Sequence, residues 1–250
     1  MYLVNFVPIS FLLESEGKIQ AWLGKGWGSS TTQAETKTIA KFVESLQIKE
    51  VVAVDIGANL GEWSGNLLRE IPTAQIYAFE PSKEAFTNLE LRFKDVDSIK
   101  CVNLGVSSQN GEVFLYADKS ASGLASLTKR RVNHHGIFFD YKEKINVLTL
   151  DTWLTSKNFL RPNIIKIDIE GHELDVLLGA REALRFVQIC QFEFGGANID
   201  TRTFFQDFYY FFIHSGFKIY RISPRGPILI NSYSEQDETF RPTNYLAVKH

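Results

Sequence analysis

The sequence predicts an α/β fold in which a mostly parallel sheet is covered by helices on both faces. Three observations predict it. From Val51 onward, short apolar strand-like runs alternate with segments of helical spacing. The turn after the first run reads Gly-Ala-Asn-Leu-Gly. The chain has 250 residues, of which 44% are hydrophobic and 22% charged, which suits one large globular domain.

The first half of the chain supplies the alternation. Ile39, Phe42, Val43 and Leu46 share one helical face. The sequence predicts helices over 33–46, 61–70 and 82–93 and strands over 51–55, 75–80 and 99–104.

The second half interrupts this rhythm and then restores it. EVFLYA and KINVLTL read as two extra strands on either side of a long polar loop. The two strands span 112–117 and 143–149, and the loop spans 118–142. The order of the remaining elements is strand 163–168, helix 172–185, strand 188–194, aromatic-rich helix 201–215 and a closing antiparallel pair, 217–223 and 244–250.

Residues 1–34 read as an N-terminal extension, which could serve as a lid, and residues 35–250 as the main domain. The apolar start lacks a basic region and a small-residue cleavage site, so we do not interpret it as a signal peptide. No run reaches the length of a membrane span. We therefore expect a cytoplasmic protein. The net charge of -2 gives no electrostatic footprint for nucleic acid.

The glycine-rich turn and a later acid together predict a nucleoside site. Ligands of open parallel sheets bind outside the carboxyl ends of the strands. Gly57 and Gly61 allow close backbone approach there, and Asp55 ends the first strand. Glu80 ends the second strand, 25 residues after Asp55, where an acid can hold both ribose hydroxyls. A plain strand–helix turn is the alternative.

The spacing of the turn indicates which nucleoside. Asn59 occupies the place of the second glycine of a dinucleotide fingerprint, which disfavours NAD or FAD because that glycine makes room for a pyrophosphate. A phosphate-free nucleoside such as S-adenosylmethionine fits better. Asp55 and nearby backbone groups could read its cationic amino-acid end.

The chain resembles class I, Rossmann-like S-adenosylmethionine-dependent methyltransferases, and specifically the FkbM family. The motifs that carry the resemblance are VDIGANLGEWS, FEPSKEAFTNL, LTLDTWL, IIKIDIEGHELDVLLGA, QFEFGG and NYLAVK. The resemblance covers roughly residues 35–250 and implies a seven-stranded sheet with an antiparallel closing strand. It also implies O-methylation of hydroxyls on polyketides, sugars and related natural products.

The same resemblance implies a set of cofactor-binding residues. Asp55, Gly57, Asn59 and Gly61 would line the methionine end, Glu80 would hold the ribose, and Asn103 would lie near the adenine.

Acidic residues follow the fourth and fifth parallel strands and suggest the reacting centre. Asp168 and Glu170 are candidates for acceptor or cofactor contacts. Asp168, His172 and Glu193, in that order, are candidate bases for removing a hydroxyl proton. Asp168, Glu170 and Glu193 could also hold a divalent cation such as Mg²⁺. Each also has a structural reading, such as ion pairing or helix capping.

The sequence therefore predicts an S-adenosylmethionine-dependent O-methyltransferase acting on a small-molecule hydroxyl, with the acceptor free or bound to a carrier. The loop over 118–142 could cover that acceptor. The alternatives are an N-methyltransferase, a nucleic-acid methyltransferase, an NAD-dependent enzyme, and a domain that binds the cofactor without catalysis and serves as a scaffold.

Overall fold

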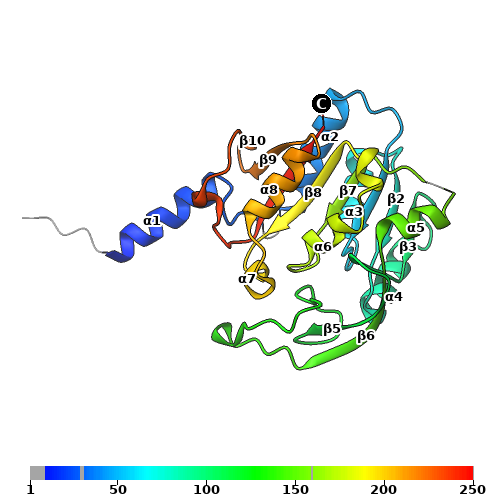
Figure 1. The fold of residues 1–250 in the computed structure, drawn as a ribbon, viewed down its shortest axis with the longest axis horizontal. Helices are drawn as coiled ribbons and strands as arrows, with labels where there is room; N and C mark the ends of the chain where they lie inside the picture. The colour runs from blue at the N-terminus through cyan, green and yellow to red at the C-terminus, as the bar shows by residue number, and fades with distance from the viewer. Residues whose placement is uncertain (1–8, 29–30, 159, 250) are drawn as a thin grey trace, which may run out of the picture.

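The computed structural model describes residues 9–28, 31–158 and 160–249 of the chain. These residues form a large twisted sheet with helices on both faces and a smaller three-stranded sheet (Figure 1). Residues 1–8 and 29–30 of the predicted extension, and His250 at the end of the last predicted strand, lie outside the described residues.

The large sheet has the strand order β3-β2-β1-β7-β8-β11-β9-β10. The strands from β3 to β8 run parallel, whereas β11 runs antiparallel to both β8 and β9. The order reverses between β1 and β7, and ligands bind at such a switch point in open sheets. The bounds are β1 Val52–Ile56, β2 Gln75–Phe79, β3 Ile99–Val102, β7 Ile164–Ile167, β8 Ile189–Phe194, β9 Lys218–Ser223, β10 Gly226–Ile230 and β11 Thr243–Val248.

This sheet has eight strands, so the predicted number of seven is wrong by one edge strand. β10 pairs antiparallel with β9 across a turn at Pro224 and Arg225. Pro227 lies within β10. Proline is depleted from strands but tolerated at a sheet edge. The sequence pattern of 226–230 therefore did not predict a strand. The closing antiparallel pair, β9 with β11, is confirmed.

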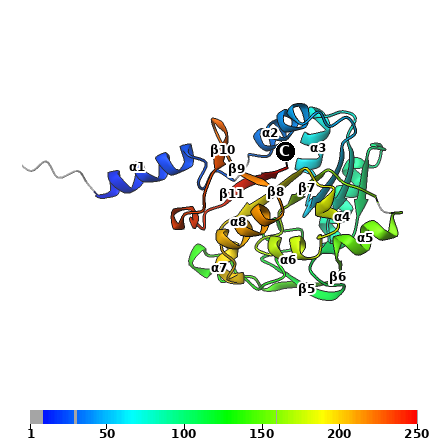
Figure 2. The same ribbon diagram turned by 45° about the horizontal axis from the view of Figure 1, so that its top comes forward.

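Two layers of helices enclose the sheet, as predicted. Ile39, Leu67 and Leu89 pack from α2, α3 and α4 onto one face. Leu150, Val176 and Phe208 pack from α5, α6 and α8 onto the other. Figure 2 shows α2 and α3 on one side of the strands and α6 and α8 on the other. The bounds are α2 Thr32–Ser45, α3 Glu62–Glu70, α4 Lys83–Phe93, α5 Leu150–Ser156, α6 Glu173–Leu178, α7 Ala197–Thr201 and α8 Phe205–His214.

Two helices are shorter than predicted. The segment 172–185 divides into α6 and the 3₁₀ turn η2 Ala183–Arg185. Gly179 separates them, and a Cβ there would lie 2.2 Å from the Ser107 carbonyl oxygen. The segment 201–215 begins only at α8, because Arg202 adopts a left-handed φ of 59° after α7. Most α8 aromatics are core residues, and Phe192 stacks on Phe208 and Phe212.

The two predicted extra strands form the smaller sheet. β5 Gly111–Ala117 pairs antiparallel with β6 Tyr141–Leu148, and the short β4 Gly105–Val106 pairs parallel with β6. The loop between β5 and β6 is held by a bridge between Tyr116 and Ser126 and contains the 3₁₀ turn η1 Asn133–His135. A further turn, η3 Glu235–Asp237, precedes β11.

The helix α1 Ile9–Trp22 projects from the main body (Figure 1). The segment after it lies on the sheet, where Arg221 donates to the Leu23 carbonyl oxygen. Trp22 is 52% exposed beneath Arg225, whereas Trp27 packs against the α2–α4 layer. The division at residue 34 and the lid role of the extension stay predictions. No helix in the described ranges is both long and apolar enough to cross a membrane.

Candidate functional site

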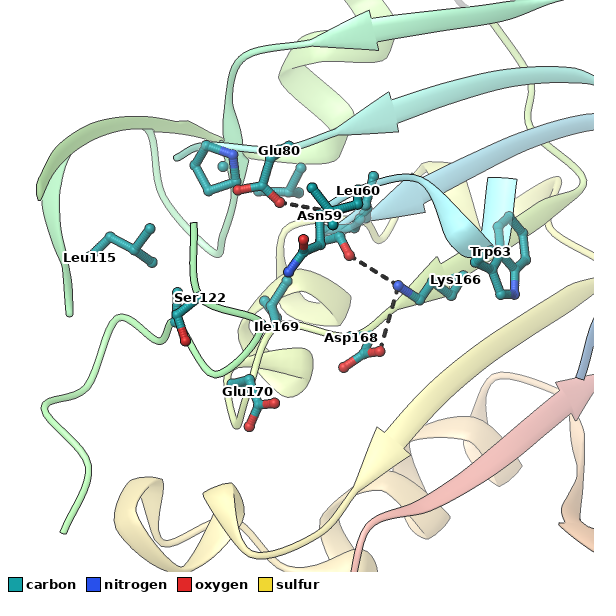
Figure 3. Close-up of a pocket in the computed structure, with 18 of the residues that line it drawn as sticks. Asn59, Leu60, Trp63, Glu80, Leu115, Ser122, Lys166, Asp168, Ile169 and Glu170 are labelled. Carbon is teal, nitrogen blue, oxygen red and sulfur yellow. Dashed lines mark hydrogen bonds and ion pairs between the residues drawn. The ribbon is translucent and has the colours of Figure 1, made fainter. Parts of the chain in front are cut away.

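A cavity of about 400 Å³ opens at the carboxyl ends of β1, β2 and β7 (Figure 3). Gly57 and Asn59 line it after β1, Glu80 after β2, and Asp168 and Glu170 after β7. The volume lies within the range of small-molecule sites, about 300–1,000 Å³. The cavity therefore occupies the place where the sequence predicts a ligand.

The two glycines of the turn are required by packing inside the protein. Gly57 has a φ of +77°, and a Cβ there would lie 2.0 Å from the Asp168 carbonyl oxygen. Gly61 has a φ of +76°, and a Cβ there would lie 2.3 Å from Phe93. Gly57 lines the cavity, and Gly61 lies outside its described lining. The backbone after β7 and the side chain of Phe93 on α4 therefore leave no space for a side chain at either glycine.

Glu80 presents a buried carboxylate to the cavity. Its Oε2 accepts the Asn59 backbone N–H at 2.8 Å, and its Oε1 accepts the Ser82 backbone N–H at 2.9 Å. Each oxygen can accept a further hydrogen bond. Burial raises the pKa of Glu80 to about 7, because only part of the lost hydration is replaced. The group is placed to accept two hydroxyls.

Asp55 is sealed beneath the cavity. Its side chain is fully buried, Ser64 donates to its Oδ2 at 2.7 Å, and Lys166 Nζ lies 3.2 Å from its Oδ1. Burial alone lowers the pKa of Lys166, but the Asp55 and Asp168 carboxylates outweigh it and raise this pKa. Asp55 is fully buried and lies outside the described lining of the cavity, and its predicted place at the methionine end stays a prediction. It holds Lys166, which does line the cavity.

Three predicted acids come together beside the cavity: Asp168 and Glu170 line it, and Glu193 lies outside its described lining. Carboxylate oxygens of Asp168, Glu170 and Glu193 all lie within 4.8 Å of one another. Glu170 adopts a left-handed φ of 55° and pairs with Arg130 from the loop after β5. Arg130 also lies 3.7 Å from Asp200. Arg130, from the charge run 129–131, therefore pairs with carboxylates of the protein itself, those of Glu170 and Asp200.

Two of the acids in this cluster have raised pKa values. Burial and the Asp168 charge raise the pKa of Glu170 to about 8. Burial, followed by the charges of Asp168 and Glu170, raises the pKa of Glu193 well above its ordinary value. Like charges at this separation disfavour full ionisation, so near neutral pH the cluster retains at least one proton. It can both accept and hold protons, and its three carboxylates could alternatively ligate a divalent cation.

Two further predicted site residues, His172 and Asn103, lie outside the described lining of the cavity. His172 is bonded through Nδ1 to Asp175 at 2.7 Å and through Nε2 to Thr128 at 3.0 Å. Both ring nitrogens are therefore occupied. Asn103 is exposed and donates from Nδ2 to the Glu80 carbonyl oxygen at 2.9 Å. In this arrangement Asn103 steadies the chain that carries Glu80.

Several residues that line the cavity were not predicted from the sequence. Glu35, at the start of α2, and Asn244, on β11, are both buried there and hydrogen-bonded to each other. Trp63 lines the same end. An acid in the first turn of a helix usually serves the helix dipole, so Glu35 carried no distinctive signal.

The opposite end of the cavity is apolar. Leu104, Val106 and Leu115 line it, together with Ile145 and Val147 of β6. The loop after β5 contributes Ser122, Gly123, Ala125 and Leu127, so part of the predicted covering loop does reach the cavity. Figure 3 shows Leu115 on one side, Glu80 between, and Lys166 with Trp63 on the other side, so the lining changes from an apolar wall through Glu80 to a charged and polar chamber.

The parallel strands, the antiparallel β11 inserted between β8 and β9, and the crevice beyond β1 define a class I, Rossmann-like methyltransferase fold. The model of the family described as the methyltransferase FkbM domain matches residues 55–219, which are 165 of the 250 residues. The chain belongs to this family.

Curated relatives are more distant. The chain is 25% identical over 157 residues to the 2-O-methyltransferase NoeI of Sinorhizobium fredii, covering 59% of this chain and 65% of NoeI. It is 26% identical over 162 residues to the hexuronic acid methyltransferase AglP of Haloferax volcanii, covering 64% of this chain and 62% of AglP. The chain thus spans less than two thirds of the length of either relative.

Among solved structures, the plantazolicin methyltransferase BpumL in complex with SAH aligns with a TM-score of 0.48 at 10% identity. The alignment covers 97% of this chain and 100% of that chain.

Proposed function

We propose that the protein is an S-adenosylmethionine-dependent O-methyltransferase that acts on a hydroxyl of a small molecule, with a sugar as the favoured acceptor. The observation that carries this proposal is the order of chemistry along the cavity. An apolar wall that includes Leu115, the buried carboxylate of Glu80 and a charged chamber that includes Lys166 follow one another across Figure 3. A base, a ribose and a zwitterionic amino acid follow one another in the same order in this cofactor.

The residues present fit this cofactor. Leu104 and Val106 offer an apolar surface to the adenine, and Glu80 has a free acceptor position on each oxygen for the ribose hydroxyls. Asn59 and Lys166 lie toward the amino-acid end. When bound, the cofactor supplies an electrophilic methyl group.

The acid cluster is suited to hold the acceptor hydroxyl and take its proton. The Asp168 side chain is 40% exposed, and its Oδ2 lies 3.6 Å from Lys166 Nζ. We assign Asp168 as the base and Glu193 as the neighbour that can share the proton. A general base typically contributes about 10²–10⁴-fold to a rate. The loop that reaches the cavity through Ala125 and Leu127 would help to exclude water.

The charge of the cluster also restricts the acceptor. Asp168, Glu170 and Glu193 together repel an anionic reacting group and favour a neutral hydroxyl. The names of the two relatives each support one part of the proposal: NoeI is a 2-O-methyltransferase, which supports an oxygen acceptor, and AglP is a hexuronic acid methyltransferase, which supports a sugar-derived acceptor.

The same three carboxylates could share a divalent cation in place of a proton, and a chelator distinguishes the two. We expect turnover to survive EDTA, because Arg130 already compensates Glu170. Loss of turnover that Mg²⁺ restores would instead establish the metal hypothesis.

A labelled-methyl assay tests the proposed function. The protein would be incubated with S-adenosyl-[methyl-³H]methionine and separate panels of sugars, uronic acids, polyketide alcohols, amines and RNA. We expect label only in hydroxylated small molecules, and none with Glu80→Ala. Label in amines or RNA would overturn the O-methylation proposal. If S-adenosylhomocysteine neither binds nor raises the melting temperature, the assignment of S-adenosylmethionine as cofactor would be refuted, and a scaffold role would be favoured.

A further inference from the structure

The charged end of the cavity contains a buried carboxylate with a distinct set of partners. Glu35 Oε1 accepts from Thr31 Oγ1 at 2.5 Å and from Asn244 Nδ2 at 2.8 Å. Glu35 Oε2 accepts from Gln191 Nε2 at 2.8 Å. Glu35 is only 4% exposed, yet it lines the cavity. Three donors from three separate parts of the chain thus hold this carboxylate in one position.

All three of these donors are neutral. Within the described ranges, no lysine or arginine forms an ion pair with Glu35, although the Lys166 charge is close enough to act on it. Burial raises the pKa of Glu35, so its partners do not fully replace water. A buried carboxylate without a paired cation is costly unless a cation arrives from elsewhere.

The surroundings of Glu35 carry a negative excess. Three carboxyl groups, those of Asp55, Asp168 and Glu35, act on the single ammonium of Lys166, so the carboxyl groups outnumber the cation by three to one. Asp55 is sealed, and Asp168 faces Lys166 and the acid cluster. Glu35 is therefore the carboxylate at this end that is left to bind a positive group in the cavity.

We propose that Glu35 is a binding residue for the α-ammonium group of the cofactor's amino-acid part, and that Asn244 and Gln191 position it. This inference rests on the proposed function, because it takes the nucleoside at Glu80 as the anchor. With the ribose at Glu80, the remaining charged part of the ligand extends past the glycine turn into the chamber lined by Trp63 and Asn244. Trp63 is fixed there, because its Nε1 donates to Gln191 Oε1 at 2.9 Å.

The test compares two nucleosides that differ in this part. S-adenosylhomocysteine carries the amino acid, whereas 5′-methylthioadenosine lacks it and retains adenine, ribose and sulfur. For Glu35→Gln, we expect the Kd of S-adenosylhomocysteine to rise at least about tenfold, as for loss of a hydrogen bond to a charged group. The Kd of methylthioadenosine should change less than about twofold, since its contacts do not reach Glu35.

A charge swap separates the charge from the hydrogen-bond network. In Glu35→Gln/Gln191→Glu, the amide at 35 can donate to the carboxylate at 191, which can still accept from Trp63. The negative charge moves from the cavity wall to a position that is 1% exposed. We expect this variant to bind S-adenosylhomocysteine as weakly as the single variant. Thr31→Val is the matched control, because it removes one hydrogen bond to Glu35 but leaves its charge, and it should retain wild-type selectivity.

The outcomes are distinguishable. Equal weakening of both nucleosides by Glu35→Gln, unchanged S-adenosylhomocysteine binding, or restored binding in the swap would each overturn the assignment of Glu35 while leaving the proposed function standing. Binding of neither nucleoside to the wild-type protein would overturn the proposed function, and this inference with it.

Discussion

Replacing Glu80 with glutamine removes one negative charge from the cavity and changes the side chain's size very little. In the wild type, Asn59 N–H and Ser82 N–H each donate to one oxygen of this carboxylate. In Glu80→Gln, one of these donors faces an amide NH₂ group. A ribose hydroxyl also loses a charged acceptor, and such bonds contribute about 1.5–3 kcal/mol each. At pH 8 we therefore expect the Kd of S-adenosylhomocysteine to rise about 10- to 100-fold.

The pH dependence gives this prediction a second, independent part. With a pKa of about 7, Glu80 is mostly ionised at pH 8 and mostly protonated at pH 6. The ionised form is the better acceptor for two hydroxyls, so wild-type affinity should fall about tenfold from pH 8 to pH 6. Glu80→Gln should lack this tenfold change.

Folding stability should move in the opposite direction. The pKa of Glu80 rises from 4.5 in the unfolded chain to about 7 in the folded protein. The stability associated with its protonated form is fully present below pH 4.5 and is lost as pH rises through 7. The loss amounts to about 3 kcal/mol, at 1.36 kcal/mol per pKa unit. The stability of the wild type relative to Glu80→Gln should therefore fall between pH 5 and pH 8 in urea denaturation.

Isothermal titration calorimetry at pH 6 and pH 8 measures the binding part. Glu84→Gln is the matched control, since Glu84 is exposed on α4 and lies outside the described cavity lining. Binding by Glu80→Gln within twofold of wild type at pH 8 would refute the ribose assignment. A tenfold pH change that persists in the variant would assign the titration to another group, such as Glu170, whose pKa is about 8.

Three further substitutions test the rest of the site. Asp168→Asn should lower turnover at least about 100-fold while changing the Kd of S-adenosylhomocysteine less than about fivefold, and equal losses would show that Asp168 only binds. Lys166→Met leaves the buried Asp55 carboxylate without its cation and should lower the free energy of unfolding, measured in urea, by about 3–5 kcal/mol. Adding Asp55→Asn to the same chain should restore most of this loss. Absence of rescue would contradict the pairing of Lys166 with Asp55. Gly57→Ala places a Cβ against the Asp168 carbonyl oxygen and should prevent stable folding. Gly65→Ala is the control, because a Cβ at this position inside α3 would have its nearest neighbour at 3.6 Å, and it should leave the melting temperature unchanged or raise it. A wild-type melting temperature for Gly57→Ala would show that the turn can relax.

The sequence predicted those parts of the site that depend on strand ends. Glu80, Asp168 and Glu193 each follow an apolar run, and parallel strands bring their carboxyl ends to one edge. Their placement at one edge of the sheet therefore follows from the alternation of strands and helices alone. The same reasoning found β5 and β6 from their apolar runs.

It could not predict contacts made across large sequence separations. Glu35 and Asn244 are 209 positions apart and meet only because β11 inserts beside β8. Arg130 reaches Glu170 from a loop whose path no periodicity determines. The burial of Asp55 could not be predicted either, because Lys166, which lies 3.2 Å from its carboxylate, comes from another strand.

The glycine turn and the acids have separate roles in this protein. Gly57 and Gly61 are needed because the β7 backbone and Phe93 leave no space for a Cβ, so the turn secures the shape of the crevice. In the proposed function, binding and proton transfer are assigned to carboxylates of different exposure. Glu80 is buried and accepts backbone N–H groups, which suits a binding role, whereas Asp168 is partly exposed beside two acids of raised pKa, which suits proton transfer. A glycine turn of this kind can therefore be shared by proteins that bind the same cofactor yet differ in whether, and on what, they act.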